Sequence, residues 1–494
     1  MRKSELSSAI KTARDIMRKD AGLSTDVDRI PQLSWILFLK CFDDLEQRRM
    51  LLGGKYRSKH RDVIEAPYRW RDWAADEDRG RTGDELLDFV NGDLFPYLRG
   101  LVGTAEGDQR DVIAGIFRET YNRMLSGYLL RDVVNLVNRI NFNVSDDVHT
   151  LSHLYESMLR EMRDAAGTNG EFYTPRPVVR FMVERMAPQI GETVYDPAAG
   201  TCGFLVEAYE YLRQQQQTIQ DRETLQTHTL YGTEKKPMPY LLGMMNLLLH
   251  GIEYPNLVRA NTLAQPLHEI TDRQRYDVIV TNPPFGGEEE AGIQANFPAG
   301  TRTSETALLF LQFIMRSLRR SKGDRPGGRC AMVLPNGPLF ATGVAARIKE
   351  DLLKDFNLQA IVRLPNGVFA PYTSIPTNLL FFQRDGPTRE IWYYELPLPK
   401  GRKNYTKTRP LRDREFDECR ELWDERPITE HSWLVPVAQV VENDYNLDLK
   451  NPAGQEALVH RPPEELAAAI LEKEQRIAEI MTEIRTALES DHRG

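Results

Sequence analysis

Short apolar runs alternate with helical stretches from about residue 170 onward, and this alternation most constrains how the chain can fold. The runs fall at residues 193–195, 229–231, 276–280, 329–334, 358–363 and 378–383. Strands that alternate with helices indicate an α/β fold with a mainly parallel sheet. Ligands of such sheets bind at the carboxyl ends of the strands. Functional residues are therefore expected where each run ends.

The region before the sheet has a different pattern. Residues 1–145 carry apolar positions at helical spacing, such as Leu6, Ile10, Ala13 and Met17. Few segments there alternate in the manner of a strand. We predict an N-terminal helical domain over 1–145 and a Rossmann-like sheet domain over 146–400.

Beyond the sheet the chain becomes polar and basic. Residues 401–460 are mixed, and seven Lys or Arg side chains lie between Lys400 and Arg414. Such a run is typical either of a solvated loop or of a contact with nucleic acid. Residues 461–494 predict a C-terminal amphipathic helix, which either packs back on its own domain or docks a partner subunit; we favour docking. Its apolar stripe comprises Leu466, Ile470, Ile477, Met481, Ile484 and Leu488.

The spacing of the cysteines and the net charge limit which classes of protein the chain can belong to. Four cysteines lie far apart without a C-x-x-C pair, so we expect reduced thiols and no metal site. No apolar run approaches the ~20 residues that span a bilayer, and no signal-like segment follows the N-terminus. We therefore expect a cytoplasmic protein without membrane contact. The net charge of −8 disfavours binding DNA unaided, because phosphate contacts supply much of that affinity.

One strand end carries chemistry that suits a planar amine. The run 276–281 is followed by Asn282-Pro283-Pro284-Phe285. A nucleobase amine or a side-chain amide is a poor nucleophile because its lone pair is delocalised. The Asn282 oxygen and the Pro283 carbonyl can each accept one N–H, which frees that lone pair, while Phe285 can stack on the ring. The alternative is an ordinary strand-ending turn, since Asn-Pro is frequent in turns.

Earlier strand ends carry a compatible set of polar residues. A turn with an acid and small residues, from Asp196 to Phe204, matches neither a dinucleotide fingerprint nor a phosphate loop. It suits a cationic ligand without phosphates. Glu234 can accept ribose hydroxyls, and Asn261 can bond an adenine edge. Alone, Asp196 fits a turn residue and Glu234 fits a charge at a helix N-terminus.

Taken in order, these motifs resemble those of the γ class of N6-adenine DNA methyltransferases. The match is closer still to the modification (M) subunit of type I restriction–modification systems, which has a helical N-terminal domain. The resemblance covers nearly the whole chain and involves residues 37–40, 170–175, 196–204, 234, 261, 282–285, 334–337, 364–369 and 373–382.

The resemblance implies a cofactor, a target and a set of site residues. S-adenosylmethionine would bind near Tyr173, Thr174, Pro175, Asp196, Gly200, Thr201, Gly203, Glu234 and Asn261. The target adenine would be flipped out of the duplex and held by Asn282, Pro283, Pro284 and Phe285. Phe369 is a candidate for stacking on the other face, with a core aromatic as the alternative.

Two positions depart from the family pattern. Cys202 stands where the turn more often has a second glycine, so a Cβ can crowd the ligand and the positive φ is lost. We expect this change to be tolerated, because sulfur is small and Gly200 and Gly203 remain. Asn261 replaces a more usual acid. The loop 288–303 is either a flap ordered by the substrate or a disordered surface loop.

No segment looks like a target-recognition domain, so we expect a partner to recognise the DNA sequence. The resemblance implies which partners these are. These are double-stranded DNA, a specificity (S) subunit and a restriction (R) subunit, with two M subunits per S. Two alternative functions remain: a protein-glutamine N5 methyltransferase, and a structural subunit that has lost catalysis.

Overall fold

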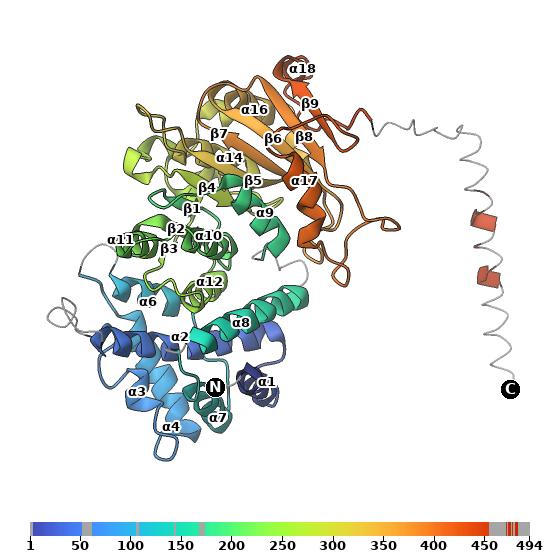
Figure 1. The fold of residues 1–494 in the computed structure, drawn as a ribbon. Coiled ribbons are helices and arrows are strands. Elements are labelled where there is room, and N and C mark those ends of the chain that lie inside the picture. The colour runs from blue at the N-terminus through green and yellow to red at the C-terminus, as the bar shows by residue number, and fades with distance from the viewer. Residues whose placement is uncertain are drawn as a thin grey trace. The chain divides into compact units, whose positions relative to one another are not determined.

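The computed structural model describes residues 3–51, 62–104, 108–142, 145–166 and 173–453, together with 471, 473–475, 477 and 480–482. The chain falls into two units, Met1–Leu449 and Lys450–Gly494 (Figure 1). None of the helices in the described part of the chain is both long enough and apolar enough to cross a membrane.

The N-terminal part is helical, as predicted. Leu6, Ile10, Ala13 and Met17 on one face of the first helix are all buried. Two of the later helices begin with side-chain caps, from Asp108 and Ser126. The helices are α1 (Lys3–Met17), α2 (Asp26–Leu51), α3 (Trp70–Trp73), α4 (Gly83–Asp88), η1 (Phe89–Leu94), α5 (Phe95–Arg99), α6 (Gln109–Phe117), α7 (Gly127–Asn138) and α8 (Ser145–Ala166).

Helix α8 joins the two predicted domains. The boundary at 145 assigns it to the sheet domain, yet it packs against α1 and α2 as well as against α12 (Pro237–Leu249). The Tyr155 hydroxyl lies 3.0 Å from the Ser34 hydroxyl and donates to the Leu242 carbonyl at 3.4 Å. The helical part and one face of the sheet therefore share a continuous core.

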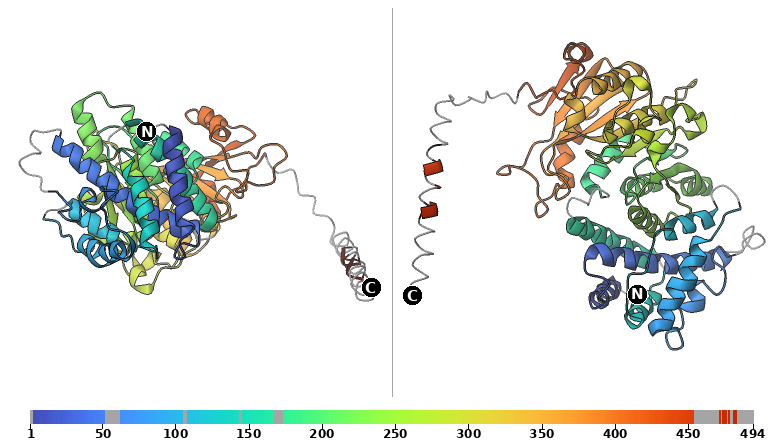
Figure 2. Two further views of the ribbon diagram at one scale, coloured as in Figure 1. Left: turned by 90° about the horizontal axis from the view of Figure 1, so that it is seen from below. Right: turned by 180° about the vertical axis from the view of Figure 1, so that it is seen from behind.

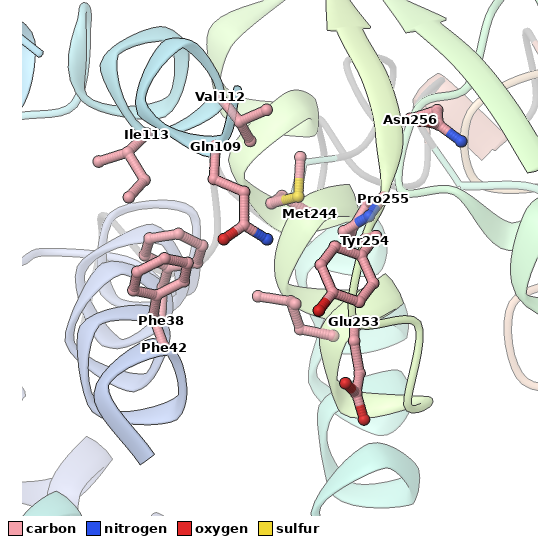
Figure 3. Close-up of a pocket in the computed structure, with 11 residues that line it drawn as sticks. Phe38, Phe42, Gln109, Val112, Ile113, Met244, Glu253, Tyr254, Pro255 and Asn256 are labelled. Carbon is pink, nitrogen blue, oxygen red and sulfur yellow. The ribbon is translucent and has the colours of Figure 1, made fainter. Parts of the chain in front are cut away.

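A small cavity marks the same seam (Figure 3). Phe38 and Phe42 of α2 lie on one side, Met244 and Tyr254 on the other, and Gln109 of α6 reaches between them. Its lining is mostly apolar, and none of the predicted site residues contributes to it.

The sheet has nine strands in the order β3-β2-β1-β4-β5-β7-β6-β8-β9. All six predicted runs form strands, and β3 ends where a strand was expected to lead to Asn261. Strands β3 to β5 in this order are parallel, whereas β7 and β9 run antiparallel to their neighbours. The strands are β1 (Val194–Asp196), β2 (Leu230–Glu234), β3 (Asn256–Arg259), β4 (Val278–Thr281), β5 (Arg329–Pro335), β6 (Asn357–Leu364), β7 (Thr377–Gln383), β8 (Glu390–Glu395) and β9 (Ser432–Pro436).

Strand β9 corrects the predicted boundary at residue 400. It lies within the segment 401–460 and pairs antiparallel with β8, so this segment completes the sheet. Pairing with β8 buries Trp433 and Val435, which explains why the chain returns to the sheet after the basic run.

Helices cover both faces of the sheet (Figure 2). Val278 and Val280 of β4 join one core, while Ile279 between them joins the other. The helices of this part are α9 (Arg176–Met186), α10 (Gly203–Arg213), α11 (Ile219–Thr224), η3 (Leu225–Thr229), η4 (Thr262–Ala264), η5 (Leu267–Glu269), η6 (Asp272–Gln274), α13 (Ala291–Gln294), η7 (Ala299–Thr301), α14 (Thr306–Ser317), α15 (Asn336–Phe340), α16 (Val344–Asp355), η8 (Asp413–Phe416), α17 (Asp417–Leu422) and α18 (Val437–Glu442).

The predicted C-terminal helix falls mostly outside the described residues. Those that are described between 471 and 482 are helical, and Ile477 and Met481 of the predicted stripe are exposed. Partner docking by 461–494 therefore stays a prediction.

Candidate active site

A cavity of about 270 Å³ lies at the carboxyl ends of β1, β2 and β4, where the strand order reverses on either side of β1. Nine of the residues predicted from the sequence line it: Thr174, Asp196, Gly200, Thr201, Gly203, Glu234, Asn261, Asn282 and Pro284. These residues are spread over more than one hundred positions of the chain, and the parallel strands bring them together.

Asn282 lines the cavity with its amide held in one orientation. Its Nδ2 donates a hydrogen bond to Thr174 Oγ1 at 3.1 Å. Its Oδ1 is buried, and no group among the described residues donates to it. A buried acceptor without a donor is costly, so it indicates a ligand donor at this point. Thr174 thus fixes which end of the amide is offered to the ligand.

Four carboxylates and two lysines line the cavity, and two of the carboxylates, those of Asp196 and Glu234, lie at strand ends. The backbone N–H groups of Gly200 and Lys236 donate to the two oxygens of Glu234 at 2.8 and 2.7 Å. Asp196 Oδ1 accepts from the Thr281 hydroxyl at 2.7 Å and from the Ala198 N–H at 3.1 Å. Burial, with the nearby charge of Glu234, raises the pKa of Asp196 to about 7. A cationic ligand would favour the ionised form of this buried acid.

Asn261 uses its side-chain oxygen within the protein. Its Oδ1 accepts from the Leu263 N–H at 3.1 Å and so caps the helix η4. The amide N–H donors are then the groups left for a ligand, which suits the acceptor nitrogens on an adenine edge.

Cys202 behaves differently from the expectation. It keeps the left-handed conformation, with φ +60° and ψ +30°, so the positive φ is not lost. For a residue with a Cβ, this conformation costs about 1–2 kcal/mol. The side chain is fully buried, and its sulfur lies 2.6 Å from where a Cβ on Gly243 would stand. The thiol therefore packs against α12 and does not line the cavity.

Phe285, Phe369 and Tyr372 lie outside the cavity lining. Phe285 is half-buried and meets Phe369 edge-on, with ring centroids 5.4 Å apart, while the ring centroid of Tyr372 lies 5.8 Å from that of Phe285. Phe369 is 4% exposed. Phe369 is thus buried and supports Phe285 in this arrangement, and its stacking on the adenine stays a prediction.

Three further predicted residues, Pro283, Pro175 and Tyr173, lie outside the cavity lining. Pro283 is buried, and Pro175 precedes the first residue of α9. Tyr173 is buried, with the guanidinium groups of Arg163 and Arg176 over its ring at 5.1 and 5.9 Å. Residues 170–172 of the same motif lie outside the described part of the chain.

The loop 288–303 is ordered, so the disordered alternative is wrong. It contains α13 and η7, buries Phe297, and bonds through Asn296 Nδ2 to the carbonyls of Leu263 and Ala264 at 3.0 Å each. Glu289 lines the cavity and lies 3.7 Å from the Lys235 ammonium, so this loop closes one side of the site.

Several lining residues were not predicted. Lys235 and Lys236 directly follow Glu234, and their position at the same strand end could have revealed them. Phe310 and Thr306 come from α14, whose apolar sequence gives no sign of a ligand.

Arg176 links three parts of the site. Its Nη1 donates to the Gly203 carbonyl in the turn 196–204 at 2.8 Å, and its Nε donates to Glu156 of α8 at 2.9 Å. Asn246 of α12 also reaches this cluster, with its Nδ2 donating to the Thr201 carbonyl at 2.9 Å. Arg176 also follows Thr174 by two positions, so it anchors the segment that orients Asn282.

We expect Arg176→Gln to weaken cofactor affinity about ten- to a hundredfold, because a charged hydrogen bond contributes about 1.5–3 kcal/mol. Titration calorimetry with S-adenosylmethionine measures this. The matched control is Arg180→Gln, one turn further along α9, where the arginine is more exposed and pairs with Glu207 at the surface. Equal losses in both variants would contradict a specific role for Arg176.

Comparisons with known proteins agree with this geometry. Residues 146–460 match the family model described as N-6 DNA Methylase, and residues 6–137 match the HsdM N-terminal domain. The first match extends past residue 400 and includes β9, which agrees with the pairing of β9 in the sheet. The chain belongs to the N-6 DNA methylase family.

Its relatives narrow the assignment within that family. The chain is 46% identical to the EcoEI type I methylase subunit of Escherichia coli, over 98% of this chain and 97% of the relative. A modification subunit of a putative type I restriction enzyme from Vibrio vulnificus is 56% identical, with a TM-score of 0.82 over 93% of this chain and 99% of that one. A chain from a structural study of type I complex assembly is 44% identical, with a TM-score of 0.83 and 99% of each chain covered. The protein is thus a methylase subunit of the type I restriction–modification group.

Proposed function

We propose that this subunit transfers a methyl group to the N6 amine of an adenine in DNA, with Asn282 and Pro283 holding that amine. The observation that carries the assignment of Asn282 is its buried Oδ1, which has no donor among the described residues while Thr174 occupies the other end of the amide. The N-6 DNA methylase family fits an adenine better than the protein amide considered above.

S-adenosylmethionine, the methyl donor of the family, supplies an electrophilic methyl group on a sulfonium. The residues present fit such a cation, because Asp196 and Glu234 place two carboxylates in one cavity. Glu234 would hold the ribose hydroxyls, and Asn261 would hold the adenine edge of the donor. Asp196 would balance the positive charge.

Asn282 and the Pro283 carbonyl would accept the two N–H bonds of the target amine. This pulls the nitrogen toward tetrahedral geometry and makes its lone pair available. Positioning and electrostatics supply the catalysis, and the nitrogen loses its proton after attack, so a strong base is not required. Phe285 would stack on the flipped adenine, with Phe369 supporting it from the core.

As a type I methylase subunit, the protein acts with specificity and restriction subunits on double-stranded DNA. We propose two such subunits per specificity subunit, docked through 461–494, in the cytoplasm. The net charge of −8 supports delegation of target recognition to the partner.

Methyl transfer is tested by incubating the complex of this chain and its specificity subunit with labelled S-adenosylmethionine and DNA. We expect the label in DNA as 6-methyladenine. Label found on protein alone would overturn the proposal. Absence of any label with intact cofactor binding would favour a structural subunit without catalysis.

A further inference from the structure

A dense group of basic residues lies in a hairpin-like loop after β8. From Lys400 to Arg412 the chain carries six positive side chains and no carboxylate, on a protein with a net charge of −8. We call residues 400–412 the basic hairpin. The basic hairpin lies beside the part of the active site that would hold the target base. This position suggests a role for its positive charge.

The basic hairpin is anchored by its apolar residues. Tyr405 is 1% exposed; its N–H donates to the Asn366 carbonyl at 2.9 Å and its hydroxyl donates to Glu415 at 2.9 Å. Leu411 is also buried. Thr406 and Arg409 exchange backbone hydrogen bonds of 3.3 and 3.1 Å, which close a turn with Lys407 near its tip.

Most charged side chains of the basic hairpin face solvent, whereas Arg402 is half-buried beside Glu415. Lys400, Lys403 and Arg409 are exposed, and no carboxylate in the described part of the chain forms an ion pair with them. Several exposed arginines elsewhere do have an acidic neighbour, as Arg18 has Asp15 and Arg139 has Glu77. An exposed cluster of unbalanced positive charge is the electrostatic signature of a polyanion contact.

Tyr405, which anchors the basic hairpin, is connected by close packing to Phe285, the residue proposed to stack on the target base. The carbonyl of Tyr405 approaches Gly367 so closely that a Cβ there would lie 2.2 Å from it. Two residues further, Phe369 packs edge-on against Phe285. On the other side, Lys407 Nζ donates to the Asp164 carbonyl of α8 at 3.4 Å, nine residues before Tyr173.

We propose that the basic hairpin binds the phosphates of duplex DNA that flank the flipped adenine. This inference rests on the proposed function and adds to it a sequence-independent grip supplied by this subunit itself. Base flipping leaves the neighbouring phosphates in place near the pocket mouth, where a cationic hairpin stabilises them. Sequence discrimination stays with the partner, because phosphate contacts carry no direct sequence information.

The test compares the triple variant Lys400→Gln, Lys403→Gln, Arg409→Gln with a control that removes the same charge elsewhere. Arg273, Lys322 and Arg389 are exposed and lie before β4, β5 and β8, at the amino ends of these strands. Their replacement by glutamine is the control. Each variant is assembled with the specificity subunit, and its affinity for cognate and unrelated duplexes is measured between 50 and 200 mM salt.

We expect the hairpin variant to lose about tenfold or more in affinity for both duplexes, with the slope of log affinity against log salt reduced by about 2–3. The control should keep the wild-type slope, and S-adenosylmethionine affinity should be unchanged in both. Unchanged slopes in the hairpin variant, while the wild type methylates DNA, would overturn the inference. Weakened assembly with the specificity subunit at unchanged slope would identify an acidic protein surface as the partner instead. Failure of the proposed function would appear separately, as a wild-type complex that leaves no label in DNA.

Discussion

Replacing Asn282 with alanine should lower the rate of methyl transfer by about 100- to 1,000-fold, the loss seen when one preorganised hydrogen-bonding group is removed from an active site. The buried Oδ1 is the acceptor that would be lost. Burst-phase or single-turnover methylation of a cognate duplex measures the effect. Cofactor affinity and assembly with the specificity subunit should stay close to wild type.

The variant Thr174→Val tests whether the orientation of the Asn282 amide matters, because it keeps that amide but removes the group that orients it. Valine removes the 3.1 Å partner of Asn282 Nδ2 and leaves the amide free to turn. We expect a smaller loss than in Asn282→Ala, and little additional loss when the two changes are combined. Fully additive losses would mean that Thr174 acts independently of Asn282.

Asp196→Asn should weaken S-adenosylmethionine binding about ten- to a hundredfold while stabilising the ligand-free protein at pH 8. The first effect follows from loss of the charge that faces a cation. The second follows from the pKa, which burial raises to about 7 in the folded state. Asparagine keeps the acceptor oxygen for the Thr281 and Ala198 bonds, so the fold is spared.

The pH range of the stabilising effect follows from linkage. The unfolded carboxyl ionises near pH 4, whereas the folded one does so only near pH 7. Ionisation in the folded state is thus unfavourable, and the penalty grows from about pH 4 and is complete above about pH 7. Melting temperatures of wild type and Asp196→Asn should coincide near pH 4 and diverge at pH 8. A variant less stable than wild type at pH 8 would contradict the pKa shift.

The catalytic half of the fold could be predicted because its signals are local. The six runs are short, rich in β-branched or apolar residues, and separated by helical stretches, so the positions of these strands along the chain could be inferred directly. Strands β8 and β9 were missed for different reasons. Ile391 to Tyr394 is a short aromatic run between two glutamates, whereas β9 is an edge strand that depends on pairing with β8.

The site could be predicted to the extent that strand ends supply it. Asp196, Glu234 and Asn282 follow from that rule, and parallel pairing places them in one cavity. Phe310 could not, because it comes from an apolar helix that the fold lays across the pocket. The conformation of Cys202 was also beyond local inference, since the room for its thiol is created by Gly243 on a distant helix.

Strand β4 lies between β1 and β5 inside the sheet, and this position affects how the protein loses activity on heating. Asn282 follows a strand whose four residues are buried and which pairs with β1 and β5. Backbone amides in such a strand exchange with solvent only through the largest openings, whereas the edges at β3 and β9 can fray alone. Thermal inactivation of methyl transfer therefore tracks cooperative melting of the central sheet, and early fraying of the edges leaves the clamp intact.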